Sequence, residues 1–141
     1  MASHRIHLRG PWDFVWRPAG GTDSETGSKS GTVTMPQEWR TLFGDVSGTA
    51  LFRRRFHRPT NLELHERVML VFTEIRGSGH VQLNGLSIGE FSAAGELVEF
   101  EISTAMKPFN EVAIDIGFDP VKEQGVPGGL FGVAALEIRT E

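Results

Sequence analysis

Polar side chains recur at every second position along two stretches of the chain. Arg53, Arg55 and His57 do so in one stretch, and His80 and Gln82 in the other. Alternate residues of an extended strand share one face, so each stretch presents hydrogen-bonding groups on a single surface. Planar polar groups of this kind can bind the paired hydroxyls of a carbohydrate. The spacing therefore predicts a polar face that could hold such a ligand, provided that the two strands are neighbours.

A sugar ring also needs an aromatic surface on which to stack. Trp12 and Trp16 alternate with Phe14, a pattern typical of a buried strand face. Trp39 lies instead in a loop before the arginine-rich strand, and core alternation explains it least. We therefore take Trp39 as the candidate stacking platform. The alternatives stay open: Trp39 could be core, and the arginines could form a solvated, salt-bridged surface.

The stretch 78–89 predicts a β-hairpin. Val81 and Leu83 alternate with polar residues, and Asn84-Gly85 is the strongest short signal for a tight hairpin turn. The valine and the leucine should face the core, and the turn should account for the asparagine.

Composition limits the function classes. The chain has 141 residues, 39% of them hydrophobic, with a net charge of −4 and no cysteine. Without a basic cluster we expect no nucleic-acid partner, and without cysteine no disulfide or thiolate site. No apolar run reaches the length of a signal peptide or a membrane span. If the chain is complete, we expect a cytoplasmic protein without a membrane partner.

Other constellations offer little chemistry. Glu99 with Glu101, or Asp115 with Asp119, could be an acid–base pair, but outward carboxylates are normally solvated. The five histidines lack the spacing of a zinc site. We expect no catalytic residue and no metal site.

Short alternating segments separated by turns, with no amphipathic helix, predict an all-β antiparallel sandwich of about eight or nine strands in one domain, 1–141. The Gly/Ser-rich segment 19–31 should be a flexible loop, followed by a strand from Thr32. The segment 37–48 could include one helical turn. Arg54, which alternates with two phenylalanines, should reach an edge or pair with a carboxylate.

Six segments, in order, resemble the N-terminal sugar-binding domain of the β-galactosidase/β-glucuronidase family (glycoside hydrolase family 2). They are Leu8-Arg-Gly-Pro-Trp12-Asp-Phe14, Met35-Pro36-Gln37-Glu38-Trp39, Gly48-Thr-Ala-Leu-Phe52-Arg53-Arg54-Arg55-Phe56, Arg67-Val68-Met69-Leu70-Val71-Phe72, Val81-Gln-Leu-Asn-Gly-Leu-Ser-Ile-Gly89, and Phe100-Glu-Ile102-Ser103 with Asn110-Glu111-Val112-Ala113-Ile114. Met35 and Phe52 replace the valine and tyrosine of the family pattern.

The resemblance implies a jelly-roll sandwich of the galactose-binding type. The family's catalytic glutamates lie in a separate barrel that this sequence does not encode, so hydrolase activity is not carried over. It implies a non-catalytic carbohydrate-binding or accessory module, with a carbohydrate or a glycoside hydrolase as partner. A structural Ca²⁺ occurs in folds of this type, but no acidic cluster stands out here, and we expect no cofactor. The alternatives are a protein-interaction or assembly module, including a homo-oligomer, and an independent enzyme.

Overall fold

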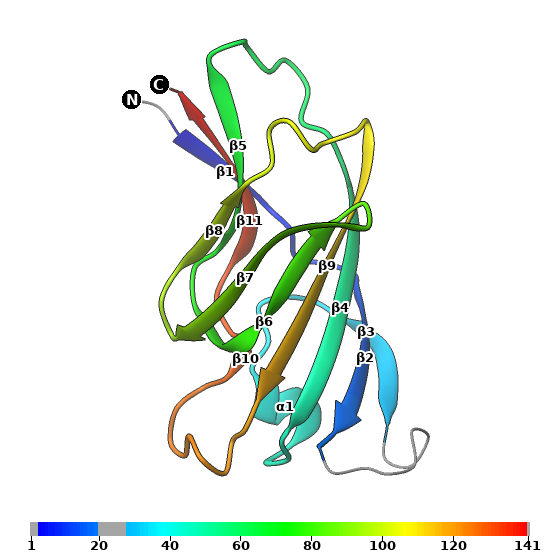
Figure 1. The fold of residues 1–141 in the computed structure, drawn as a ribbon, viewed down its shortest axis with the longest axis vertical. Coiled ribbons are helices and arrows are strands. Elements are labelled where there is room, and N and C mark those ends of the chain that lie inside the picture. The colour runs from blue at the N-terminus through cyan, green and yellow to red at the C-terminus, as the bar shows by residue number, and fades with distance from the viewer. Residues whose placement is uncertain (1–2, 20–27, 141) are drawn as a thin grey trace.

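Two antiparallel β-sheets pack face to face in the computed structural model, which describes residues 3–19 and 28–140 (Figure 1). The small sheet has the order β1 (Ser3–His7), β11 (Ala134–Thr140), β5 (Glu66–Phe72), β8 (Val98–Glu101). The large sheet has the order β10 (Gly129–Leu130), β6 (Ile75–Leu83), β9 (Phe109–Phe118), β4 (Gly48–His57), β2 (Trp12–Pro18), β3 (Lys29–Val33), with β7 (Leu86–Ala94) paired to β6. The short helix α1 (Trp39–Phe43) lies at the end of the sandwich opposite the two termini (Figure 1).

This architecture confirms the predicted all-β antiparallel sandwich. Eleven strands occur in the described residues, against the eight or nine expected. The two last strands, β10 and β11, are separated by only three residues, 131–133.

The segment 19–31, predicted as a loop, is only partly described, because residues 20–27 lie outside the described residues. Its last three residues belong to β3, so this strand begins earlier than the predicted Thr32. Lys29 pairs with Trp16 and Gly31 with Phe14 in the β2–β3 ladder. Gly31 leaves room for the Phe14 ring, which a Cβ would approach to 3.3 Å. Pairing with an aromatic strand therefore overrides a turn-like composition.

The inner face of the large sheet is aromatic near α1. Trp12, Phe14 and Trp16 are buried on β2, as their alternation predicts. Phe43 of α1 stacks on Trp16 with ring centroids 5.1 Å apart, and meets Phe14 edge-on at 5.5 Å. Truncating a buried ring of this kind costs about 3–5 kcal/mol, so these rings are a major part of the core.

The predicted hairpin at 78–89 is confirmed. Leu83 pairs with Leu86 across a two-residue turn, in which Asn84 and Gly85 have φ values of 53° and 83°. Two positive φ angles define a type I′ turn, whose twist matches that of the strands. Val81 and Leu83 are buried, so the polar residues of β6 face outward.

Strand β9 lies between β4 and β6 in the large sheet (Figure 1). β6 and β9 approach closely: a Cβ on Gly79 would lie 1.6 Å from the carbonyl oxygen of Asp115. Only glycine fits at that position of β6. The close pairing places the outward side chains of β6 in register with those of β9.

The outward side of the small sheet is covered. Met69 and Val71 alternate with the core residues of β5, point away from the other sheet, and are nevertheless buried. Above them, Glu137 accepts hydrogen bonds from Arg5 (2.6 Å) and from Arg139, which also pairs with Glu99. We call this surface the sealed face, defined by Arg5, Met69, Val71, Glu99, Glu137 and Arg139.

The charges of the sealed face hold one another ionised. Arg5 and Arg139 both donate to Glu137 and lower the pKa of its carboxyl. Glu99 first, and then Glu137, raise the pKa of the Arg139 guanidinium. Glu137 is only 7% exposed, so this is a partly desolvated network rather than a set of independent surface pairs.

Candidate functional site

The outward side of the large sheet carries five of the predicted site residues. Arg53, Arg55 and His57 project from β4, and His80 and Gln82 from β6, opposite to the buried side chains of the same strands. We call this surface the open face. It is defined by the outward residues Asp13, Val15, Arg17, Thr49, Leu51, Arg53, Arg55, His57, His80, Gln82, Phe109, Glu111, Ala113 and Asp115.

The two groups of candidates share a face, but their strands are not neighbours. Arg53 of β4 and Gln82 of β6 both pair with Ala113 of the intervening β9. In the next row, His80 pairs with Asp115. Two strand spacings separate the groups by about 10 Å, so they can contact one extended ligand but not one hydroxyl pair.

Trp39 is not part of this face, and the expectation that its ring is an exposed platform is wrong. Its side chain is 1% exposed at the start of α1, packed edge-on against Phe43 (4.8 Å) and Phe118 (5.6 Å). Its indole N–H donates to the carbonyl oxygen of Val46 at 3.0 Å. The ring therefore has no free surface on which a sugar could stack.

An exposed ring does occur beside the predicted residues. Phe109, the first residue of β9, is 72% exposed, and its ring meets that of His57 edge-on with centroids 4.9 Å apart. Arg55 and Glu111 form the adjacent pair in the same ladder, with Nε and Oε2 3.6 Å apart. These four side chains, with Asn84, line a cavity of about 420 Å³, which we call the ring hollow.

Two side-chain amides, the half-buried Asn84 and the buried Asn110, position the ring hollow. The Asn84 side-chain N–H donates to Oδ1 of Asn110 (3.0 Å), and the backbone N–H of Glu111 donates to Oδ1 of Asn84 (2.8 Å). Asn110 also bonds both the N–H and the carbonyl of Lys107. The β6–β7 turn is thereby fastened to the start of β9. Asn84 accordingly has a structural role beyond its turn, and its side chain is already engaged.

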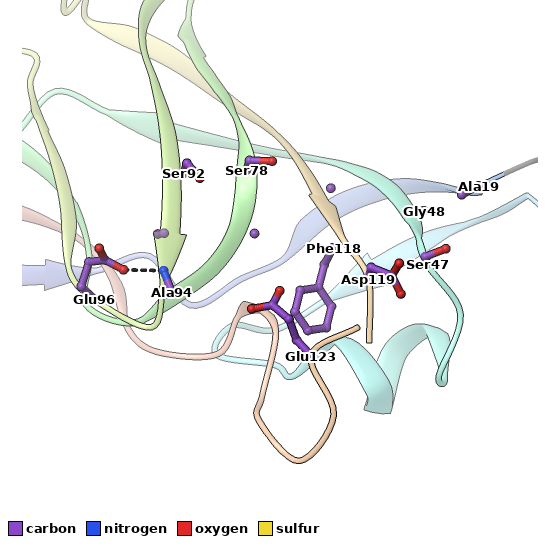
Figure 2. Close-up of a pocket in the computed structure, with 13 residues that line it drawn as sticks. Ala19, Ser47, Gly48, Ser78, Ser92, Ala94, Glu96, Phe118, Asp119 and Glu123 are labelled. Atoms are coloured by element: carbon purple, nitrogen blue, oxygen red, sulfur yellow. Dashed lines mark hydrogen bonds between the residues drawn. The ribbon is translucent and has the colours of Figure 1, made fainter. Parts of the chain in front are cut away.

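A second, wider hollow lies at the other end of the open face. Figure 2 shows Ser78 of β6 and Ser92 of β7 on one side of this cavity of about 570 Å³, and Asp119 and Glu123, after β9, on the other. The backbone N–H of Ala94 donates to Glu96 and holds the pKa of that carboxyl below its ordinary value. Among the described residues that line this hollow the one aromatic ring, that of Phe118, is buried and offers no stacking surface.

The remaining sequence candidates are placed as follows. Glu99 is paired with Arg139 and Glu101 with Arg67, so neither is a merely solvated carboxylate. No group of three or more His, Asp or Glu side chains that could hold a metal occurs in residues 3–19 and 28–140. Within the same residues, no helix is long and apolar enough to cross a bilayer.

Sequence reasoning missed Phe109, although a signal for it was present. Val112, Ile114, Ile116 and Phe118 alternate on the core face of β9, so the odd-numbered residues of this strand face outward. Extending that parity one residue before Asn110 places a phenylalanine on the open face.

Comparisons with known proteins were made by sequence and by structure. No protein-family model and no curated protein matches the sequence. Among solved structures, a putative β-galactosidase from Bacteroides fragilis superimposes with a TM-score of 0.77 at 24% identity, over 99% of this chain and 24% of that chain. An FMN-binding β-glucuronidase from Faecalibacterium prausnitzii L2-6 matches with a TM-score of 0.75 at 19% identity, over 98% and 23%.

A further match is a Bifidobacterium dentium β-glucuronidase complexed with coumarin-3-O-glucuronide, with a TM-score of 0.71 at 18% identity, over 98% of this chain and 30% of that one. The chain thus spans a quarter to a third of the length of these three proteins. The described residues hold a sandwich and no catalytic barrel. The likeness shows a shared fold, consistent with the N-terminal jelly-roll domain that the sequence motifs resemble.

Proposed function

We propose that this chain is a non-catalytic carbohydrate-binding module that holds its ligand on the open face, across the ring hollow. The observation that carries the proposal is the 72% exposed ring of Phe109 beside planar polar groups. A pyranose stacks its apolar face on an aromatic ring, while its hydroxyls bond to groups at the edge of the ring. Arg55, His57 and Glu111 supply donors and an acceptor there.

The ring hollow supports binding rather than hydrolysis. A glycosidase needs two carboxylates about 5–10 Å apart on either side of the scissile bond. Glu111 is the one carboxylate among the residues lining this hollow, and it is paired with Arg55. The structural relatives are named as β-glucuronidases and β-galactosidases, which makes glycosides the first ligands to test.

The test is isothermal titration of the chain with galactosides, glucuronides and plant polysaccharides. Phe109→Ala should weaken binding by about 1–3 kcal/mol, the scale of an aromatic contact, without loss of stability. Val15→Ala is the matched control, because Val15 is 41% exposed on the same face and does not line the ring hollow. Unchanged affinity in Phe109→Ala would exclude this ring as the platform.

The rival function is a protein-interaction module, including a homo-oligomer. An exposed phenylalanine is also the kind of side chain that anchors a protein interface. Absence of binding across the glycan panel, together with a dimer in sedimentation that Phe109→Ala dissociates, would favour this rival.

A further inference from the structure

β4 extends beyond its neighbour β2, which leaves a notch at the edge of the open face. The β2–β4 ladder ends at the pair Asp13–Arg53, whereas the β4–β9 ladder continues to His57. Along the uncovered edge lies a cavity of about 310 Å³, lined by Pro11, Asp13, Arg53, Arg54, Arg55 and Glu111. We call it the arginine notch.

The three consecutive arginines of the notch have few partners. Arg53 makes no hydrogen bond or ion pair with any residue that the structure describes. Arg54 donates to two backbone carbonyls, those of Arg55 (2.5 Å) and Gly10 (3.4 Å), and pairs with no carboxylate of the described residues. Its Nε is buried without a hydrogen-bond partner. Of the three, only Arg55 has an acidic partner, Glu111 at 3.6 Å.

The charges that face the notch do not cancel. Its lining has three guanidinium groups and two carboxylates, those of Asp13 and Glu111. Asp13 pairs with Arg53 in the ladder, yet their side chains form no ion pair. Burial lowers the pKa of Arg54, because desolvation disfavours its charged form. An anion bound here would accept hydrogen bonds from these guanidinium groups and would balance their excess positive charge.

We propose that the arginine notch binds an anionic group, so that the ligand of the open face is an acidic saccharide. This inference rests on the proposed function, because the ring hollow and the arginine notch share Arg55 and Glu111 as lining residues. One sugar ring lies on Phe109, and the carboxylate of a uronic acid, or a sulfate ester, lies against Arg53 and Arg54. Planar guanidinium groups suit either anion.

The test compares two matched disaccharides, galactobiose and digalacturonate, which differ by a carboxylate in place of a hydroxymethyl group at each sugar. In calorimetry at low salt, the acidic ligand should bind about tenfold more tightly, an advantage that added salt reduces. Arg53→Gln removes a side chain without a partner in the described residues, so the fold should not change. It should lower the affinity for digalacturonate several-fold more than the affinity for galactobiose. Asp13→Asn should raise the acidic preference.

Equal affinity for the two disaccharides would overturn the inference while leaving the proposed function standing. The same holds if Arg53→Gln and Arg54→Gln both keep the acidic preference. If neither disaccharide binds, inorganic sulfate is the remaining probe, read from the side-chain Nε–H signals of Arg53 and Arg54 by NMR. Sulfate-induced shifts that Arg53→Gln abolishes would support an anion site without a sugar function. If sulfate shifts neither Nε–H signal, the anion site itself is overturned.

Discussion

On the sealed face, two apolar side chains of β5 lie beneath a network of ion pairs, whereas on the open face Arg53 and Arg55 of β4 are exposed to solvent. Both faces have alternating strands with charged outward residues. They differ in what the charges do: Glu137 accepts from two arginines, while Arg53 has no partner in the described residues. The sealed face uses its charges for stability, and the open face has charges available to a ligand. Three substitution experiments can break or sharpen this contrast.

The largest expected difference comes from the same substitution on the two faces. Val71→Thr places a hydroxyl at a 0% exposed position beneath the ion pairs, whereas Val15→Thr places it in solvent. A buried hydroxyl without a partner costs about 2 kcal/mol, and the exposed one should change the unfolding free energy by less than about 0.5 kcal/mol. Urea denaturation of both variants measures this. Equal losses of unfolding free energy in the two variants would mean that the two faces do not differ in how they bury their outward side chains.

A smaller difference is expected from matched carboxylates. Glu137→Gln removes the charge that two arginines share, and Glu111→Gln removes a carboxylate whose partner Arg55 is 89% exposed. We expect a loss of about 1–2 kcal/mol for the first, because its partners stay partly desolvated, and less than about 0.5 kcal/mol for the second. Thermal unfolding of the two variants measures both stability losses. A larger loss for Glu111→Gln would reverse the roles assigned to the faces.

The smallest effect is the pH dependence of stability that Glu137 contributes on the sealed face. Hydrogen bonds from Arg5 and Arg139 lower the folded-state pKa of Glu137 below its ordinary 4.5. As the pH falls, the unfolded chain takes up this proton first, so the stabilisation is complete above about pH 5 and is lost as the pH falls through the folded-state pKa.

The unfolding free energy of the wild type should therefore fall more steeply below about pH 4.5 than that of Glu137→Gln. The two curves should converge at low pH, where both side chains are neutral. Parallel curves across this range would contradict the assignment.

The contrast also shows what a sequence reveals. Alternation predicted the core face of β2 and, together with the Asn84-Gly85 turn signal, the β6–β7 hairpin. It also predicted the outward direction of Arg53, Arg55, His57, His80 and Gln82. It could not show that β9 lies between β4 and β6, because strand order depends on pairing between distant segments. Nor could it show that charges far apart in the chain, such as Arg5 and Glu137, meet on the sealed face.

Trp39 and Phe109 were misjudged for related reasons. Trp39 looked like a loop residue, but it begins the short helix α1, where residues four apart share a face, so it packs with Phe43 in the core. Phe109 is the first residue of β9 and lies one residue before Asn110, where the last segment that resembles the family pattern begins. Strand and helix boundaries are local details, yet they decide which of the two rings is available to a ligand.

The most direct test of the central claim, that the open face is the ligand surface, is a backbone NMR titration with digalacturonate and galactobiose. The account predicts that shift changes gather around Phe109, Glu111, Arg53 and Arg55, and spare Val71, Glu137 and Arg139 of the sealed face. Changes confined to the sealed face, or no change anywhere at millimolar ligand, would contradict it.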